Sequence, residues 1–167
     1  MAYYFAYGSN LDYTRMFNRC PSSDVIGRCE LEGFQLAFME NNSHRIVANL
    51  IEQGDGIVYG VLYEVSEEDL EALDMYEGHP YVYQRRTVKI ACRGNEYNAV
   101  TYIMNRKAKI HNKDCQLSFI RKFGIPKGEY FSHIQRGYEM FGLPQSYLMK
   151  QYKFSRDLGI EELKNYI

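Results

Sequence analysis

The order of apolar and polar residues predicts a chain made largely of strands. Residues 2–7 form a continuous apolar and aromatic run, which is typical of a buried strand. Further strand-like segments follow at 25–31, 34–39, 45–51, 57–65, 82–92 and 96–104. Gly54-Asp55-Gly56 is expected to form a hairpin turn, because glycine and aspartate tolerate positive φ angles. Most neighbouring strands are therefore expected to pair as antiparallel hairpins.

Two helices are predicted in the first half of the chain. Asn10 is suited to cap a short helix that continues to about Asn18. Ser66 and Asp69 have the spacing of a capping box, so a second helix is expected to begin there. Gly78 is suited to end that helix.

The last third of the chain is predicted to be mainly helical. The segment 106–128 is polar and is expected to be a loop around a short helix near 114–123. Apolar residues recur on one face over 128–141, which predicts an amphipathic helix, and a last short helix is expected at 157–166. Clustered strands with inserted helices indicate an α+β fold, with a mixed, largely antiparallel, β-barrel-like sheet and flanking helices.

Length and composition are those of one domain. The chain has 167 residues, a length sufficient to bury one hydrophobic core. Its composition, 46% hydrophobic and 25% charged, is normal for a globular domain. We expect a single domain over 1–167, in which 155–167 could form a C-terminal extension.

The charge and the cysteine content indicate which binding partners and which cellular compartment to expect. The formal net charge is −1, so no overall field attracts nucleic acid or an anionic membrane. No apolar run approaches the roughly 18 residues of a membrane span. Four widely spaced cysteines fit reduced thiols, and the N-terminal segment does not resemble a signal peptide. We therefore expect a cytoplasmic protein that binds neither nucleic acid nor a membrane, and the sequence leaves open whether it is a monomer or a homodimer.

The sequence predicts neither a metal site nor a cofactor. The four histidines lack the i, i+4 spacing of a zinc-binding helix. The glycine-rich patterns of nucleotide-binding loops do not occur in the chain either.

Tyr7, Gly8, Ser9 and Asn10 place strand-breaking residues directly after the first predicted strand. One interpretation is an ordinary turn between a strand and a helix. The other is a loop whose backbone N–H groups hold an anion or a developing oxyanion, with Gly8 allowing close approach. Ser9 does not have the G-x-S-x-G flanks of a serine nucleophile. The residues alone leave the turn and the binding loop as alternatives.

Glu77 is the candidate acid–base residue. It lies at the predicted C-terminal end of a helix, where the helix dipole disfavours a further negative charge. Tyr76, Tyr81 and Tyr83 are close to it in sequence, and a carboxyl group buried against aromatic rings has a raised pKa that suits proton transfer. The alternative is an ordinary solvated glutamate at a helix end.

Five segments occur in the same order as in the γ-glutamylcyclotransferase family. They are YFAYGSNL at 4–11, ANLI at 48–51, VYGVLYEV at 58–65, LDMYEG at 73–78 and GEYFSHIQRGYEMFGLPQSY at 128–147. Over roughly residues 3–150 the chain resembles this family, which includes γ-glutamylamine cyclotransferases and the AIG2-like and BtrG-like proteins.

The resemblance implies a role for each matching residue. The family's loop that holds the γ-glutamyl group through backbone amides corresponds here to Tyr7, Gly8, Ser9 and Asn10. Glu77 matches the family's acid–base glutamate. Tyr102 and Tyr130 match tyrosines that line the site and orient that carboxyl group.

The activity that the resemblance implies is the release of 5-oxoproline from a γ-glutamyl amine or peptide. The α-amine of the substrate attacks its own γ-carbonyl, so such an enzyme needs neither a serine or cysteine nucleophile nor a metal. It needs one carboxyl group that takes a proton from the amine and returns it to the leaving nitrogen. The alternative is a non-catalytic protein that binds a small acidic metabolite in the same cleft. The residues do not specify the leaving group.

Overall fold

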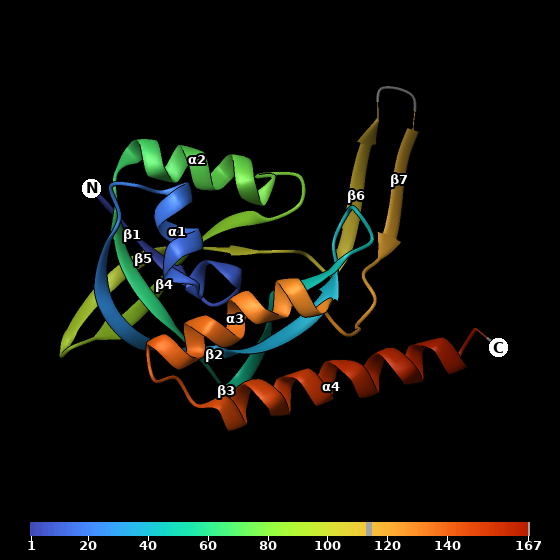
Figure 1. The fold of residues 1–167 in the computed structure, drawn as a ribbon. Coiled ribbons are helices and arrows are strands. Elements are labelled where there is room, and N and C mark those ends of the chain that lie inside the picture. Colours follow the sequence, from blue (N-terminus) through green and yellow to red (C-terminus); the bar gives the residue numbers. More distant parts are fainter. Residues whose placement is uncertain (113–114, 167) are drawn as a thin grey trace.

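The centre of the molecule is a closed five-stranded barrel (Figure 1). The computed structural model describes residues 1–112 and 115–166. The barrel strands are β1 (Ala2–Ala6), β2 (Asp24–Glu40), β3 (Ile46–Val65), β4 (Gln84–Cys92) and β5 (Asn95–Ile103). Their order is β1-β3-β2-β4-β5, and the barrel closes where β1 and β5 pair in parallel while the other pairs are antiparallel. The predicted α+β fold with a largely antiparallel, barrel-like sheet is confirmed.

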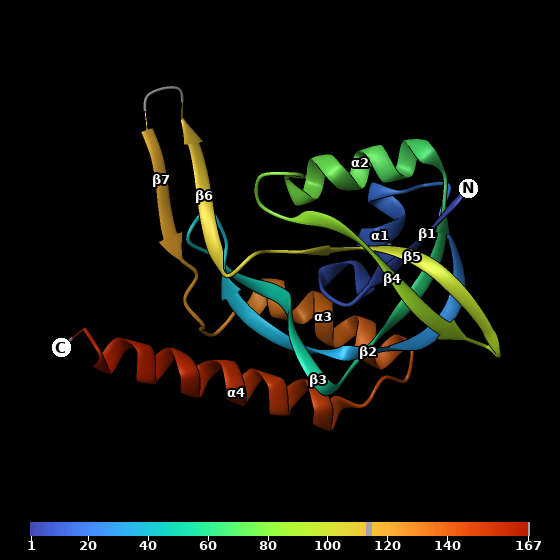
Figure 2. The ribbon, with the colours of Figure 1, turned by 180° about the vertical axis from the view of Figure 1, so that it is seen from behind.

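Helices flank this barrel, and a separate hairpin projects from it (Figures 1 and 2). The helical elements are η1 (Ser9–Leu11), α1 (Tyr13–Arg19), α2 (Glu67–Glu77), α3 (Gly128–Met140) and α4 (Gln145–Lys164). The hairpin consists of β6 (Lys107–Asn112) and β7 (Cys115–Ile120). In the described part of the chain, no helix has the length and apolar character needed to cross a membrane.

Each of the two longest strands was predicted as two shorter ones. The segments 25–31 and 34–39 belong to the single strand β2, which has a register shift between Glu32 and Phe34. Gly33 adopts a φ angle of 82° at this bulge, a conformation that favours glycine. The bulge allows β2 to bend without ending.

The hairpin turn predicted at residues 54–56 is wrong. These residues lie inside β3, which pairs with β2 on both sides of the bulge. A Cβ atom at Gly56 would collide with the carbonyl oxygen of Phe34. This glycine therefore permits close contact between two bent strands, rather than a change of chain direction.

The loop predicted within 106–128, with its short helix, is also wrong. β6 and β7 pair as an antiparallel hairpin from Lys107 opposite Ile120 to Asn112 opposite Cys115. Part of the predicted helix near 114–123 lies outside the described residues, and most of the remainder is β7. Short polar strands that are stabilised mainly by pairing with each other show no clear apolar pattern, so they are difficult to predict from the sequence.

Local capping signals predicted α2 correctly and α1 less well. Ser66 and Asp69 form a reciprocal capping box at the start of α2, and Gly78 ends it with a φ angle of 64°. α1, however, is capped by Asp12, whose Oδ1 accepts a hydrogen bond from the Thr14 amide at 3.1 Å. The side chain of Asn10, the predicted cap, instead turns inward.

The C-terminal helices cover the loop and the barrel. α3 occupies nearly all of the predicted span 128–141, and the helix predicted at 157–166 is the end of a longer α4. A Cβ atom at Gly137 of α3 would collide with Leu11, so α3 packs directly against η1. This contact fixes the loop that follows β1.

Arg121 is a fully buried cation held by carbonyl oxygens. Its guanidinium donates hydrogen bonds to the carbonyl groups of Glu40, Asn105 and Val82 at 2.7 to 3.4 Å. It thereby ties the base of the hairpin to the end of β2 and to the segment before Tyr83. That segment leads directly into the candidate site.

Candidate active site

A small cavity, the inner cavity, lies at the loop that follows β1. Its volume is about 30 Å³, and it is lined by Tyr4, Tyr7, Gly8, Ser9, Asn10, Ala48, Glu77, Tyr83, Tyr102 and Tyr130. All seven residues predicted from the sequence are among them, although they come from segments up to about 120 residues apart. Their roles in binding and catalysis stay predictions.

A larger space, the outer cleft, adjoins the inner cavity. Its volume is about 350 Å³, and Ser9, Glu77, Tyr83 and Tyr130 line both spaces. The inner cavity alone admits only a small polar group, since a cavity needs about 10–15 Å³ of such space to hold a single water molecule. A larger ligand must therefore extend through this junction into the outer cleft.

Glu77 is the last residue of α2, and its side chain is 18% exposed at the junction. Burial raises the pKa of Glu77, because loss of water disfavours the charged carboxylate; nearby Arg19, Arg15 and Asn10 oppose this increase without cancelling it. A raised pKa makes this carboxyl group a better proton acceptor than an ordinary glutamate, which suits acid–base chemistry.

Asn10 and Arg19 orient the Glu77 carboxylate. The Asn10 amide nitrogen donates to the hydroxyl of Tyr4 at 2.9 Å and to Oε1 of Glu77 at 3.4 Å. Arg19 donates to the Asn10 amide oxygen at 2.9 Å, which fixes the orientation of the amide, and its Nη1 lies 3.9 Å from Oε1 of Glu77. The guanidinium also lies over the ring of Tyr76, 4.4 Å from its centroid.

Tyr102 is held by the same helix that carries Glu77. Its hydroxyl donates to Asp74 on α2 at 2.7 Å, and Arg85 donates to the same carboxylate at 2.6 Å. The backbone carbonyl of Tyr102 accepts a hydrogen bond of 2.5 Å from the Tyr7 hydroxyl. Tyr102 thus contacts the inner cavity without a hydrogen bond to Glu77, and it links β5 to both α2 and the loop after β1.

Ala48 of β3 is bound by two tyrosines. The Tyr83 hydroxyl donates to the Ala48 carbonyl at 2.6 Å, and the Tyr130 hydroxyl accepts from the Ala48 amide at 3.0 Å. Burial raises the pKa of Tyr130 to about 12 and raises that of Tyr83 well above its ordinary value. Both phenols therefore stay protonated at neutral pH, which leaves Glu77 as the group of this junction suited to accept a proton.

The loop after β1 has a compact backbone. The amides of Leu11 and Asp12 donate hydrogen bonds to the carbonyl groups of Gly8 and Ser9, respectively. The amides of Ser9 and Asn10, which precede them, take no part in these hydrogen bonds of the turn. A Cβ atom at Gly8 would lie 3.2 Å from the Cβ of Ala48. The space beside Gly8 is therefore tight, and a side chain at this position would press on β3.

Sequence reasoning missed three residues of this site. Tyr4 is hidden within the first apolar run, Ala48 contributes through its backbone, and Arg19 contacts the site only because α1 folds beside α2. Of the tyrosines near Glu77 in sequence, Tyr83 lines the inner cavity, whereas Tyr81 is not one of its walls and is 64% exposed.

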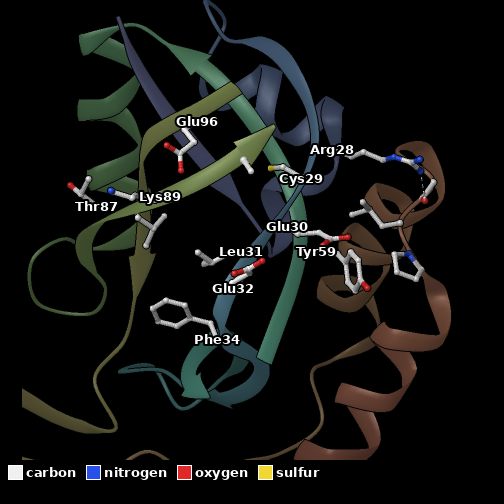
Figure 3. A pocket seen from close by; sticks show the side chains of 15 residues that line it. Arg28, Cys29, Glu30, Leu31, Glu32, Phe34, Tyr59, Thr87, Lys89 and Glu96 are labelled. Atoms are coloured by element: carbon white, nitrogen blue, oxygen red, sulfur yellow. Dashed lines mark hydrogen bonds between the residues drawn. The ribbon is translucent and has the colours of Figure 1, made fainter. Parts of the chain in front are cut away.

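A larger groove of about 1090 Å³ lies elsewhere on the barrel, between β2, β4 and the turn before α4 (Figure 3). It occupies the space where β2 and β4 diverge after pairing at Glu30 and Ala91. Glu30, Glu32, Lys89 and Glu96 line it from exposed positions. The groove shares no lining residue with the inner cavity and offers no sequestered acid comparable to Glu77.

Among residues 1–112 and 115–166, no group of three or more histidine, cysteine or acidic side chains is arranged to hold a metal ion. Cys20, Cys29 and Cys92 are buried free thiols, and the side chain of Cys115 is outside the described part of the structure.

Comparison with known proteins assigns the chain to a family of enzymes. A solved structure of a protein named gamma-glutamyl cyclotransferase matches this chain with a TM-score of 0.71 and 27% sequence identity, covering 90% of this chain and 85% of that one. The family model described as gamma-glutamyl cyclotransferase, AIG2-like, matches residues 4–130. The chain belongs to this AIG2-like γ-glutamylcyclotransferase family, a family of enzymes.

Two relatives illustrate how far the likeness extends. The γ-glutamylcyclotransferase of Mus musculus is 28% identical over 155 residues, which cover 88% of this chain and 75% of that protein. The putative γ-glutamylcyclotransferase YkqA of Bacillus subtilis is also 28% identical, over 86% of this chain but only 48% of its own length.

Proposed function

We propose that this enzyme releases 5-oxoproline from a γ-glutamyl amine or peptide, with Glu77 as the general acid and base. The observation that carries the proposal is the position of Glu77. Its carboxyl group has a raised pKa and lies where a small tyrosine-lined cavity meets a larger cleft. A γ-glutamyl substrate that bends at this junction can present both its α-amine and its scissile amide to one carboxyl group.

The proposed reaction needs two proton transfers. Glu77 takes a proton from the α-amine, whose nitrogen attacks the γ-carbonyl carbon and forms the five-membered ring. The protonated Glu77 then gives that proton to the leaving nitrogen as the amide C–N bond breaks. General acid–base catalysis of this kind contributes about 10²–10⁴-fold, and holding the substrate bent adds a proximity term.

The loop after β1 is proposed to bind the developing oxyanion. Its Ser9 and Asn10 amides do not take part in the turn's own hydrogen bonds, and backbone donors of this kind contribute about 3–4 kcal/mol in other enzymes. Tyr7, Tyr102 and Tyr130 are proposed to shape the cavity as neutral groups. Asn10 additionally holds the Glu77 carboxylate through its side chain.

The test is a panel of γ-glutamyl compounds incubated with the parent enzyme and with Glu77→Gln. Mass spectrometry should detect 5-oxoproline from at least one compound with the parent enzyme and strongly reduced release with the variant. Binding of these compounds without any 5-oxoproline would instead identify the non-catalytic alternative.

A further inference from the structure

Two buried cysteines lie opposite each other where β2 and β4 close the barrel. The strands pair antiparallel at Glu30 and Ala91, and among the described residues this is the one pair in their register. One position along, the same register places Cys29 of β2 opposite Cys92 of β4. Directly opposite residues have Cβ atoms about 4.5–5.5 Å apart, and a disulfide needs about 3.5–4.5 Å. A small movement therefore suffices to join the two side chains.

The two thiols contact each other. The Sγ atom of Cys92 accepts a hydrogen bond from the thiol of Cys29 and donates one to the carbonyl oxygen of Arg28 at 3.7 Å. A Cβ atom at Gly27 would lie 3.4 Å from the same sulfur, so Cys92 packs directly against β2. Only 7% of Cys29 and 2% of Cys92 are exposed. The barrel itself therefore holds the two sulfur atoms together.

The groove between β2 and β4 gives a small molecule a path to this pair (Figure 3). Its volume is about 1090 Å³, and the Cys29 side chain forms part of its wall and points from β2 toward β4. Spaces of about 300–1,000 Å³ are typical of sites that hold a small organic molecule. Cys20, by contrast, is fully buried and does not line this groove. An oxidant in the groove therefore meets the Cys29–Cys92 pair and not Cys20.

Both thiols are protonated at neutral pH. Burial raises the pKa of each, because loss of water disfavours the thiolate. For Cys92, the nearby charge of Arg93 and the hydrogen bond from Cys29 oppose this increase without cancelling it. Because the thiolate is the reactive form, oxidation of the pair is expected to be slow. The pair is therefore suited to respond to sustained oxidising conditions rather than to a brief exposure.

We propose that a small-molecule disulfide oxidises Cys29 and Cys92 to a reversible disulfide, which locks the seam between β2 and β4. One cysteine thiolate attacks a sulfur of the external disulfide, which gives a mixed disulfide and releases one thiol. The other cysteine attacks the mixed disulfide, forms the Cys29–Cys92 bond and releases the second thiol. Two protein thiols are oxidised, one external disulfide is reduced, and the two protons pass to the released thiols. This modification site goes beyond the proposed function and does not depend on Glu77.

The test equilibrates the parent protein in redox buffers of hydroxyethyl disulfide and mercaptoethanol. Neither compound carries a γ-glutamyl group, so the proposed enzymatic reaction cannot consume them. After free thiols are alkylated under denaturing conditions, mass spectrometry of a digest should detect the peptides of Cys29 and Cys92 linked in the oxidising buffers and separate in the reducing ones. The oxidised protein should have a Tm higher by roughly 5–15 °C, because the bond closes a long loop of the unfolded chain.

Three variants control this measurement. Cys29→Ala and Cys92→Ala should each lose the linked peptides and the difference in Tm between the two buffers. The matched control is Cys115→Ser, which removes a cysteine of β7 outside the barrel and should keep both. If either alanine variant fails to fold, the parent protein in the two buffers still decides the question, since that comparison needs no substitution.

Several outcomes would overturn the proposal. Mixed disulfides alone, links to Cys20 or Cys115, or links between two chains would show that the pair does not close on itself. An equal or lower Tm after the Cys29–Cys92 bond has formed would show that the bond strains the barrel instead of locking its seam. None of these outcomes affects the proposed function, which is measured by 5-oxoproline release.

Discussion

Glu77→Gln should abolish most turnover while preserving the shape of the site. The glutamine side chain can still accept a hydrogen bond from Asn10, whose amide nitrogen lies 3.4 Å from Oε1 of Glu77. It cannot transfer a proton in either direction. General acid–base catalysis is worth about 10²–10⁴-fold, or about 3–5 kcal/mol at 1.36 kcal/mol per tenfold. We expect kcat/KM to fall by this factor with little change in KM.

The same substitution should stabilise the folded protein at neutral pH. Burial raises the folded-state pKa of Glu77 above its unfolded value of about 4.3, so the folded state binds this proton more tightly. The resulting stability is fully present below the unfolded pKa and is lost as the pH rises through the folded pKa. Above the folded-state pKa, the ionised and partly desolvated carboxylate lowers the stability of the folded state, and glutamine removes this destabilising charge. The difference in Tm between variant and parent should therefore grow with pH.

The assay combines 5-oxoproline release with thermal unfolding measured over a pH series that starts at about pH 4, near the unfolded pKa, and rises from there. Glu71→Gln is the matched control, because Glu71 is an exposed glutamate of the same helix and should change neither measurement. Turnover by Glu77→Gln at the parental rate would exclude Glu77 as the acid–base group. A variant less stable than the parent at neutral pH would contradict the raised pKa.

Four further substitutions test the loop and the elements that hold it. Ser9→Ala should slow the reaction only about tenfold or less, which is the value of one neutral hydrogen bond. Gly8→Val should slow it far more, because its side chain enters a tight space beside the cavity. The measurement is kcat/KM for both variants, and a greater loss in Ser9→Ala than in Gly8→Val would identify Ser9 as a nucleophile. Gly137→Ala should destabilise the protein by about 1–3 kcal/mol through its collision with Leu11, and unchanged urea unfolding would refute that packing. Ser66→Ala should cost about 1 kcal/mol by removing the cap of α2, and equal Tm values would show that the cap is dispensable.

Features whose hydrogen bonds and packing are local could be predicted from the order of residues alone. The capping box at Ser66 and the left-handed Gly78 define α2 through contacts within a few residues, and this places Glu77 at a helix end. The break after the first apolar run likewise indicated the loop at Gly8. Such signals need no knowledge of distant partners, because each cap satisfies backbone groups of its own helix.

Which side chains meet at the site depends on packing between segments that are far apart in the sequence. The residues around Asn10 predict that it caps a helix. Its side-chain amide instead donates a hydrogen bond to Glu77, which is 67 residues away, and Asp12 caps α1. The contact between Asp12 and His133 spans 121 residues and forms only because α3 packs on the loop after β1. Strand lengths were decided in the same way, since β2 and β3 continue through glycines that would end isolated strands. A buried polar group takes the partner that the completed fold provides, and the order of residues along the chain does not contain that information.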